Sequence, residues 1–181
     1  MNLLLRTAVA AALVVAAMPA AASPAFDGFR AACGDSHADF AAVKAAVDAG
    51  HWVPTEVQSA TMEGVTVTES LARTVVAGAA KLTIFAWHGV KGEVQVSACT
   101  VRVSPAKFAD MAADAKAWAG FAPQSADAAK AIWQFTDAGG ARKALQKSEF
   151  TAAAATPGGL EFFTVKPDGS EVILDLLKIK S

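Results

Sequence analysis

The chain has 181 residues, and its 16 lysine and arginine residues nearly balance 17 aspartate and glutamate residues, leaving a formal net charge of −1. A charge this small, without a basic cluster, excludes the electrostatic footprint that nucleic-acid-binding proteins need. No lysine- or arginine-rich amphipathic stretch indicates a helix that lies on a membrane surface. Ten phenylalanine and four tryptophan residues supply the bulky side chains that a packed core requires.

The first 22 residues have the three-part layout of a secretory signal peptide. An early arginine precedes an apolar run from Ala8 to Met18, and a proline and three alanines follow. The run is too short for a transmembrane helix, which needs roughly 20 apolar residues. We therefore expect cleavage after Ala22 and a periplasmic or secreted domain of residues 23–181, with no membrane association once the signal is removed.

Helical periodicity dominates the beginning of this domain. An apolar stripe at three- and four-residue spacing runs from Phe26 to Cys33 and continues from Phe40 to Val47. Ser36 is placed to cap the second of these helices, and Gly50 is placed to end it. A further helix is expected from Thr68 to Ala79.

Strand patterns dominate the later part of the chain. Residues 81–89 alternate in polarity and residues 92–104 are rich in β-branched side chains, with a hairpin loop between them. Residues 131–137 form another predicted strand. The clearest signal is a terminal hairpin over residues 160–180 that turns at Asp168-Gly169. Its apolar residues occupy both faces, which predicts burial between two layers.

Two predicted helices lie among these strands, one beginning at Ser104-Pro105 and one over residues 141–150. Val96 and Val101 fall on opposite faces of their strand, so either a bulge near Ala98 or burial of both faces is expected. The whole pattern predicts an α+β fold, in which a single domain holds a largely antiparallel sheet of about four to five strands covered by helices.

Residues 31–40, "AACGDSHADF", contain two short motifs that carry chemistry in other proteins. A lipoprotein signal needs an aliphatic residue three places before its cysteine, but Arg30 holds that place, and Cys33 lies far beyond the apolar run. A Gly-Asp-Ser esterase needs a catalytic histidine far downstream, but the residues before Ser36 are helical in pattern and the last histidine is His88. Helix capping explains Ser36 better than catalysis does.

Two other patterns also lack what their chemistry requires. Ser104-x-x-Lys107 matches the nucleophile motif of penicillin-recognising enzymes, but no Ser-Asp-Asn or Lys-Thr-Gly element accompanies it. Five side chains are soft metal-ligand candidates, and their spacing matches no zinc pattern. They are Cys33, His37, His51, His88 and Cys99. We therefore assign no catalytic residue, no metal ligand and no cofactor.

One resemblance rests on the run from Cys33 through "DSHADFAAVKAAVDAGHW" and on Cys99 in a later strand. These segments resemble small secreted proteins of Gram-negative bacteria that share a Cys…Gly-x-Trp…Cys pattern and have no assigned activity. The resemblance covers mainly residues 33–52 and 94–103. It implies an extracytoplasmic location and a disulfide, and it implies nothing about chemistry.

The chain has only two cysteines, and an exported protein meets an oxidising compartment where such pairs close and persist. We therefore predict a Cys33–Cys99 disulfide that fastens the N-terminal helix to the sheet. Two buried free thiols and an intermolecular bridge are the alternatives.

Aromatic content without a nucleophile set indicates a non-catalytic module that binds an unknown protein partner or a small apolar ligand. Trp52 and Trp87, with Arg73 as a polar neighbour, are the candidate contacts, and the competing interpretation places both tryptophans in the core. The alternative function is a hydrolase with an unrecognised active site, so whether the protein is an enzyme stays open.

Overall fold

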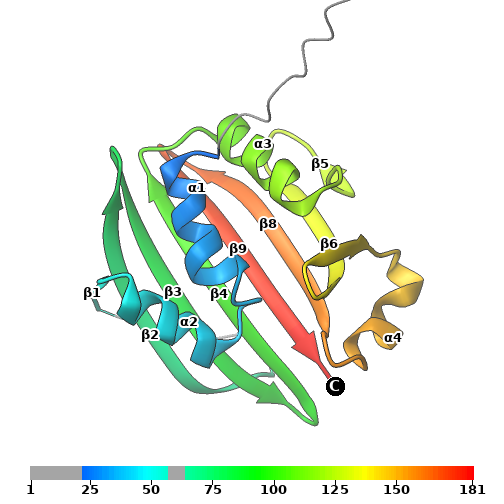
Figure 1. Ribbon diagram of the computed structural model, residues 1–181. Helices are drawn as coiled ribbons and strands as arrows, with labels where there is room; N and C mark the ends of the chain where they lie inside the picture. Colours follow the sequence, from blue (N-terminus) through cyan, green and yellow to red (C-terminus); the bar gives the residue numbers. More distant parts are fainter. Residues whose placement is uncertain (1–21, 57–63) are drawn as a thin grey trace, which may run out of the picture.

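A computed structural model describes residues 22–56 and 64–181 (Figure 1). The expected signal peptide falls almost wholly on residues 1–21, which lie outside the described residues, as do residues 57–63.

The described residues form one sheet of nine strands, in which every neighbouring pair is antiparallel. The order is β1-β2-β3-β4-β9-β8-β6-β5, and β7 pairs with β6. The strands are β1 (Val53–Pro54), β2 (Thr66–Ala77), β3 (Ala80–Lys91), β4 (Val94–Ser104), β5 (Ser125–Ala126), β6 (Ala131–Ala138), β7 (Ala141–Ala144), β8 (Leu160–Asp168) and β9 (Glu171–Lys180).

The predicted fold class, an α+β domain with a sheet of four to five strands covered by helices, is therefore wrong. The expected helix over Thr68–Ala79 is the long strand β2. Leu71 and Val75 lie four residues apart, a spacing that puts two side chains on one face of a helix and equally on one face of a strand. The β-branched run Thr74-Val75-Val76 favours the strand.

The helix predicted over residues 141–150 is also wrong for the first part of that range. Ala141–Ala144 is instead strand β7, paired with β6 after a turn that contains Gly139 and Gly140. Helical structure begins only at Lys147, with a 3₁₀ turn over Lys147–Glu149 that leads into α4 (Phe150–Ala154).

The terminal hairpin is confirmed. β8 ends at Asp168, β9 begins at Glu171, and Gly169 has a φ of +62°, which glycine adopts without strain in the turn. β9 lies between β4 and β8, so the hairpin is in the middle of the sheet (Figure 1). Its inner position explains why apolar residues occupy both of its faces.

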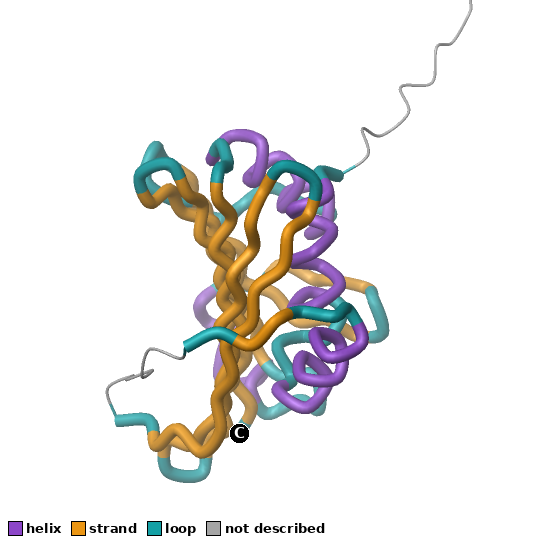
Figure 2. The backbone as a smooth tube through the Cα atoms, turned by 90° about the vertical axis from the view of Figure 1, so that its left-hand side faces the viewer, coloured by secondary structure: helices purple, strands orange, loops and turns teal. Residues whose placement is uncertain are grey.

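Three α-helices and a π-helical turn cover one face of the sheet, which we call the helix-covered face (Figure 1). Figure 2, turned by 90°, shows most helical turns on one side of the strands. These elements are α1 (Pro24–Phe29), a π-helical turn (Arg30–Gly34), α2 (Phe40–Ala49) and α3 (Phe108–Ala119). The main apolar core lies between these helices and the sheet.

Phe163 on β8 is at the centre of this core and is fully buried. Its ring stacks on Phe29 at a centroid distance of 4.9 Å and meets Trp118 edge-on at 5.2 Å. Trp133, also fully buried, lies 5.5 Å from it and donates its indole N–H to the Phe121 carbonyl oxygen. These contacts join α1, α3 and the β6–β8 side of the sheet.

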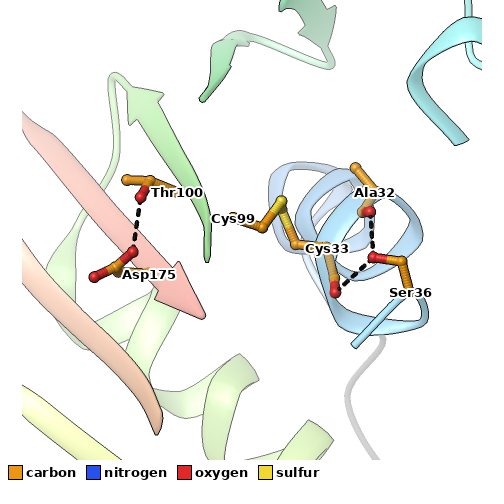
Figure 3. Close-up of a disulfide and its surroundings, with 6 residues drawn as sticks. All are labelled: Ala32, Cys33, Ser36, Cys99, Thr100 and Asp175. Atoms are coloured by element: carbon orange, nitrogen blue, oxygen red, sulfur yellow. Dashed lines mark hydrogen bonds between the residues drawn. A yellow bond between two sulfur atoms is a disulfide. The ribbon is translucent and has the colours of Figure 1, made fainter. Parts of the chain in front are cut away.

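The predicted Cys33–Cys99 disulfide is present, and it joins the π-helical turn to β4 (Figure 3). The two Cα atoms lie 5.6 Å apart, and both cysteines are fully buried. Thr100, the next residue on β4, points to the other face and donates its hydroxyl to the Asp175 carboxylate at 2.7 Å.

The opposite face of the sheet holds two smaller apolar clusters. Trp87, Val96 and Ala98 form one of them, and α4 covers the other by packing Phe150 against Phe162 at 5.3 Å. The register in β4 is continuous. Of the two expectations for this strand, burial of both faces is therefore correct and the bulge near Ala98 is wrong.

Two helix starts differ from the prediction. The cap of α2 is Asp39, whose carboxylate accepts from the Ala42 N–H at 3.0 Å, and Ser36 lies one turn earlier. α3 begins at Phe108 instead of following Ser104-Pro105 directly, and the intervening Ala106 donates its N–H to the Ser170 carbonyl oxygen.

Candidate ligand-binding site

A groove with a volume of about 470 Å³ lies on the helix-covered face of the sheet, beside the first turn of α2. Asp39, Phe40 and Ala41 form the side that belongs to α2, and Pro157 lies across from them. Residues from β2, β3, β4 and β9 line the rest. The volume is in the usual range of small-molecule sites.

A row of five polar residues crosses the sheet at this groove. Successive members are direct cross-strand partners, from β2 through β3, β4 and β9 to β8. The row is Glu69, His88, Ser97, Lys178 and Glu161. Because directly paired residues of neighbouring strands share a face, all five side chains project toward the helices. The first four line the groove.

The His88 imidazole is held from two sides. Its Nε2 lies 2.8 Å from the Glu69 carboxylate, and the Phe40 ring lies 5.0 Å from the imidazole centroid. Thr68 Oγ1 lies 3.4 and 3.3 Å from the two ring nitrogens and donates to the His88 carbonyl oxygen. A hydroxyl has a single hydrogen, and here it is donated to a backbone carbonyl oxygen and not to the imidazole. Thr68 is therefore not arranged as a nucleophile activated by His88.

Beyond Lys178 the row ends in a buried charge cluster of His37, Asp137, Arg142 and Glu161. The side chains of Glu161 and Asp137 are each 1% exposed. His37 Nδ1 lies 3.1 Å from Glu161 Oε1 and 3.9 Å from Asp137 Oδ2. The Arg142 Nε lies 3.3 Å from Asp137 Oδ2, and its guanidinium stacks over the Trp118 ring at 3.9 Å. Two acids thus face Arg142 and His37, so the cluster is electrically balanced when His37 carries its proton.

The hydrogen bond to Glu161 raises the pKa of His37 above 6.5, and the charges of Glu161 and Asp137 act in the same direction. Burial and the nearby charge of Lys178 oppose this shift. His37 and Ala38 both have a φ of +53°, a left-handed conformation that is costly for residues other than glycine. Strained backbone of this kind gathers at functional sites, and here it brings the imidazole onto Glu161.

Comparison with protein-family models, with curated proteins and with solved structures finds no match to this chain.

The three residues expected to contact a ligand do not lie together. Trp52 is partly buried against the main core, and Arg73 lies on the helix-covered face with its guanidinium 3.9 Å from the Asp48 carboxylate. Arg73 lines a hollow of about 300 Å³ that shares Phe40 and Glu69 with the groove. Trp87 is only 6% exposed and belongs to the opposite face.

The residues of the "AACGDSHADF" stretch have separate roles. Cys33 is bonded to Cys99, and the Ser36 hydroxyl donates to the carbonyl oxygens of Ala32 and Cys33 (Figure 3). Gly34 permits close packing, because a Cβ there would lie 3.0 Å from the Trp118 ring. Within residues 22–56 and 64–181, no group of three or more histidine, cysteine, aspartate or glutamate side chains could hold a metal ion.

Sequence reasoning missed Ser97, Lys178 and the buried acids. A signal for Glu161 was available, since it lies two and four residues before Phe163 and Val165 and therefore shares their face, whose other residues belong to the core. Ser97 and Lys178 carry no such signal, because only the pairing of β4 with β9 brings them together.

Proposed function

We propose that this protein is a secreted or periplasmic, non-catalytic binding protein whose groove takes a small polar ligand. The observation that carries the proposal is the polar row, which places Glu69, His88, Ser97 and Lys178 side by side in the groove. Placing convergent polar groups from four strands in one hollow is how proteins fix the orientation of a small ligand.

Export is supported by the sequence of residues 1–22 and by the disulfide, since such bonds persist in oxidising compartments. None of the helices in the described part of the chain is long and apolar enough to cross a membrane.

The groove favours a polar ligand over the apolar ligand suggested by the aromatic content. Phe40 is its largest apolar side chain, and charged or hydroxyl-bearing side chains surround it. On the opposite face, the buried apolar residues Trp87, Val96 and Ala98 are packed against one another.

A thermal-shift panel tests this proposal. Purified exported protein is heated with neutral sugars, amino acids, carboxylates, phosphate esters and fatty acids in turn. A ligand at about one hundred times its Kd adds about 2.7 kcal/mol of stability. For a domain of this size that raises the midpoint by roughly 5–10 °C. We expect one polar class to do so.

Two matched variants locate the binding. Ser97→Met places a longer side chain on the groove floor. Thr136→Met makes a comparable change on β6, on the face of the sheet that is opposite to the groove. The ligand-induced rise of the unfolding midpoint should fall by more than half in Ser97→Met and persist in Thr136→Met. A panel in which only fatty acids raise the midpoint, or in which nothing does, would contradict the proposal.

A hydrolase is the second candidate, because Glu69, His88 and Ser97 follow one another across adjacent strands in the order acid, base, hydroxyl. It ranks lower because, among the described residues, no hydrogen bond joins the Ser97 hydroxyl to the His88 imidazole, which nucleophilic catalysis needs. We expect no turnover of p-nitrophenyl esters. Turnover that disappears in Ser97→Ala would establish the hydrolase instead.

A further inference from the structure

The charges lining the groove are not equally available to a ligand. Glu69 is paired with His88 at 2.8 Å, and the Asp39 carboxylate is occupied as the cap of α2. Lys178 and Lys180 line the same groove, and within the described ranges neither has an acidic partner within 4.0 Å. Of the residues that the structure describes, the two lysines are therefore the charged side chains of the groove that are left without a side-chain partner.

Lys178 forms no ion pair with the buried cluster next to it. Its cross-strand partner on β8 is Glu161, the nearest acid in the row. The Glu161 Oε1 is bonded to His37 at 3.1 Å, its Oε2 is buried without a hydrogen-bond partner, and Asp137 is paired with Arg142. Among the described residues, His37 is thus the cation that contacts Glu161, and Lys178 is not paired with it.

The segment that precedes β8 lies beside the aliphatic side-chain stem of Lys178. Gly159, with a φ of +74°, approaches β9 so closely that a Cβ there would lie 2.7 Å from the Ile179 carbonyl oxygen and 3.5 Å from Lys178 Cε. Pro157, two residues earlier, lines the groove. The end of the Lys178 stem therefore lies beside this segment.

Ser97 and Lys180 complete one wall. Ser97 is directly opposite Lys178 across the β4–β9 pair, and Lys180 is two residues further along the same face of β9. The Cα atoms of Lys178 and Lys180 are about 7 Å apart, as residues i and i+2 of a strand are. Two ammonium groups that start from these positions, with the Ser97 hydroxyl beside the first, suit a ligand group with several anionic oxygens.

We infer that the ligand of this groove is a small anion whose carboxylate or phosphate oxygens are held by Lys178 and Lys180, with the Ser97 hydroxyl as a neutral donor. This inference rests on the proposed function and specifies its ligand class. A ligand of that kind leaves the Glu69–His88 side to contact its uncharged part.

Titration calorimetry on the exported protein tests the inference with inorganic phosphate, succinate and glucose as probes. We expect phosphate or succinate to bind, and the probe that binds identifies which oxyanion the groove takes. Affinity should fall about tenfold or more in Lys178→Met, since a charge-assisted hydrogen bond is lost. Lys178→Arg should retain most of it, and added sodium chloride should weaken it.

The matched control is Lys166→Met, which removes an exposed lysine from the opposite face of β8 and should leave affinity unchanged. Equal losses in Lys166→Met and Lys178→Met would show non-specific charge attraction and overturn the inference. Glucose binding that Ser97→Met abolishes, without anion binding, would overturn it while the proposed function stands. Failure of every polar class in both assays would remove both proposals.

Discussion

His37 shows how one side chain connects the strained turn after the disulfide to the buried acids of the sheet. Its imidazole is 33% exposed, yet its Nδ1 faces the Glu161 and Asp137 carboxylates, with Arg142 and Lys178 as the neighbouring cations. Two acids that are almost fully buried are tolerated only when compensating charge lies close. His37 supplies part of that charge only while it is protonated.

The stability of the protein should therefore depend on pH through His37. Because Glu161 raises the folded-state pKa of His37 above 6.5, its contribution is fully present below that value. The contribution is lost as the pH rises through the higher folded pKa. We expect the free energy of unfolding, measured by urea denaturation, to fall across this window in the wild type and to fall less in His37→Asn.

Asparagine suits this test because it tolerates the left-handed backbone of residue 37. His51→Asn is the control, since His51 is also left-handed but exposed and away from the buried acids. Identical pH profiles for the wild type and His37→Asn would show that His37 does not stabilise the cluster through its charge.

At the scale of elements, the disulfide and the central hairpin fix the N-terminal helices above the middle of the sheet. Cys99 on β4 is paired with Leu176 of β9, so the bond fastens the π-helical turn to the two strands that carry Ser97 and Lys178. The start of α2, which forms one side of the groove, follows this turn by six residues.

Removing the disulfide should therefore cost much of the stability of the fold. The bond closes a sequence separation of 66 residues, for which the chain-entropy relation gives about 4 kcal/mol. We expect the double variant Cys33→Ala/Cys99→Ala to lose roughly that much in urea denaturation, and the wild type to lose a similar amount in reductant. A loss below about 1 kcal/mol in both would show that packing alone holds the helix on the sheet.

The sequence predicts an element correctly when residues that are neighbours in the chain determine it, and fails when long-range strand pairing determines it. The hairpin over residues 160–180 was predictable because two apolar runs flank a Pro-Asp-Gly turn, so the strand and turn signals agree. β2 was not, since its apolar spacing fits both helix and strand. The polar row was not either, because it depends on the insertion of β9 between β4 and β8, a long-range pairing that no local pattern specifies.

For the whole molecule, the proposed export is connected to the contacts of Ser23. Ser23 caps α1, and its backbone nitrogen lies 3.1 Å from the Asp114 carboxylate of α3. Cleavage after Ala22 would turn this nitrogen into an α-ammonium beside that carboxylate, so that a charged donor replaces a neutral amide donor and the hydrogen bond becomes an ion pair.

Intact-mass measurement of secreted protein should therefore find a chain that begins at Ser23. Asp114→Asn should destabilise this chain by about 1 kcal/mol, since it removes a charge-assisted hydrogen bond. A mature chain that begins at Cys33 with the added mass of a lipid would contradict the account of export.

The most direct test of the whole account is to map where a bound ligand lies. Amide resonances of isotope-labelled exported protein are followed while the anion that binds in calorimetry is added. The account predicts that shifts concentrate at Phe40, Ser97, Lys178 and Lys180, which line the groove, and leave Phe85 and Trp87 on the opposite face unchanged. Shifts that centre on Phe85 and Trp87, or that scatter over exposed lysines of both faces, would contradict it.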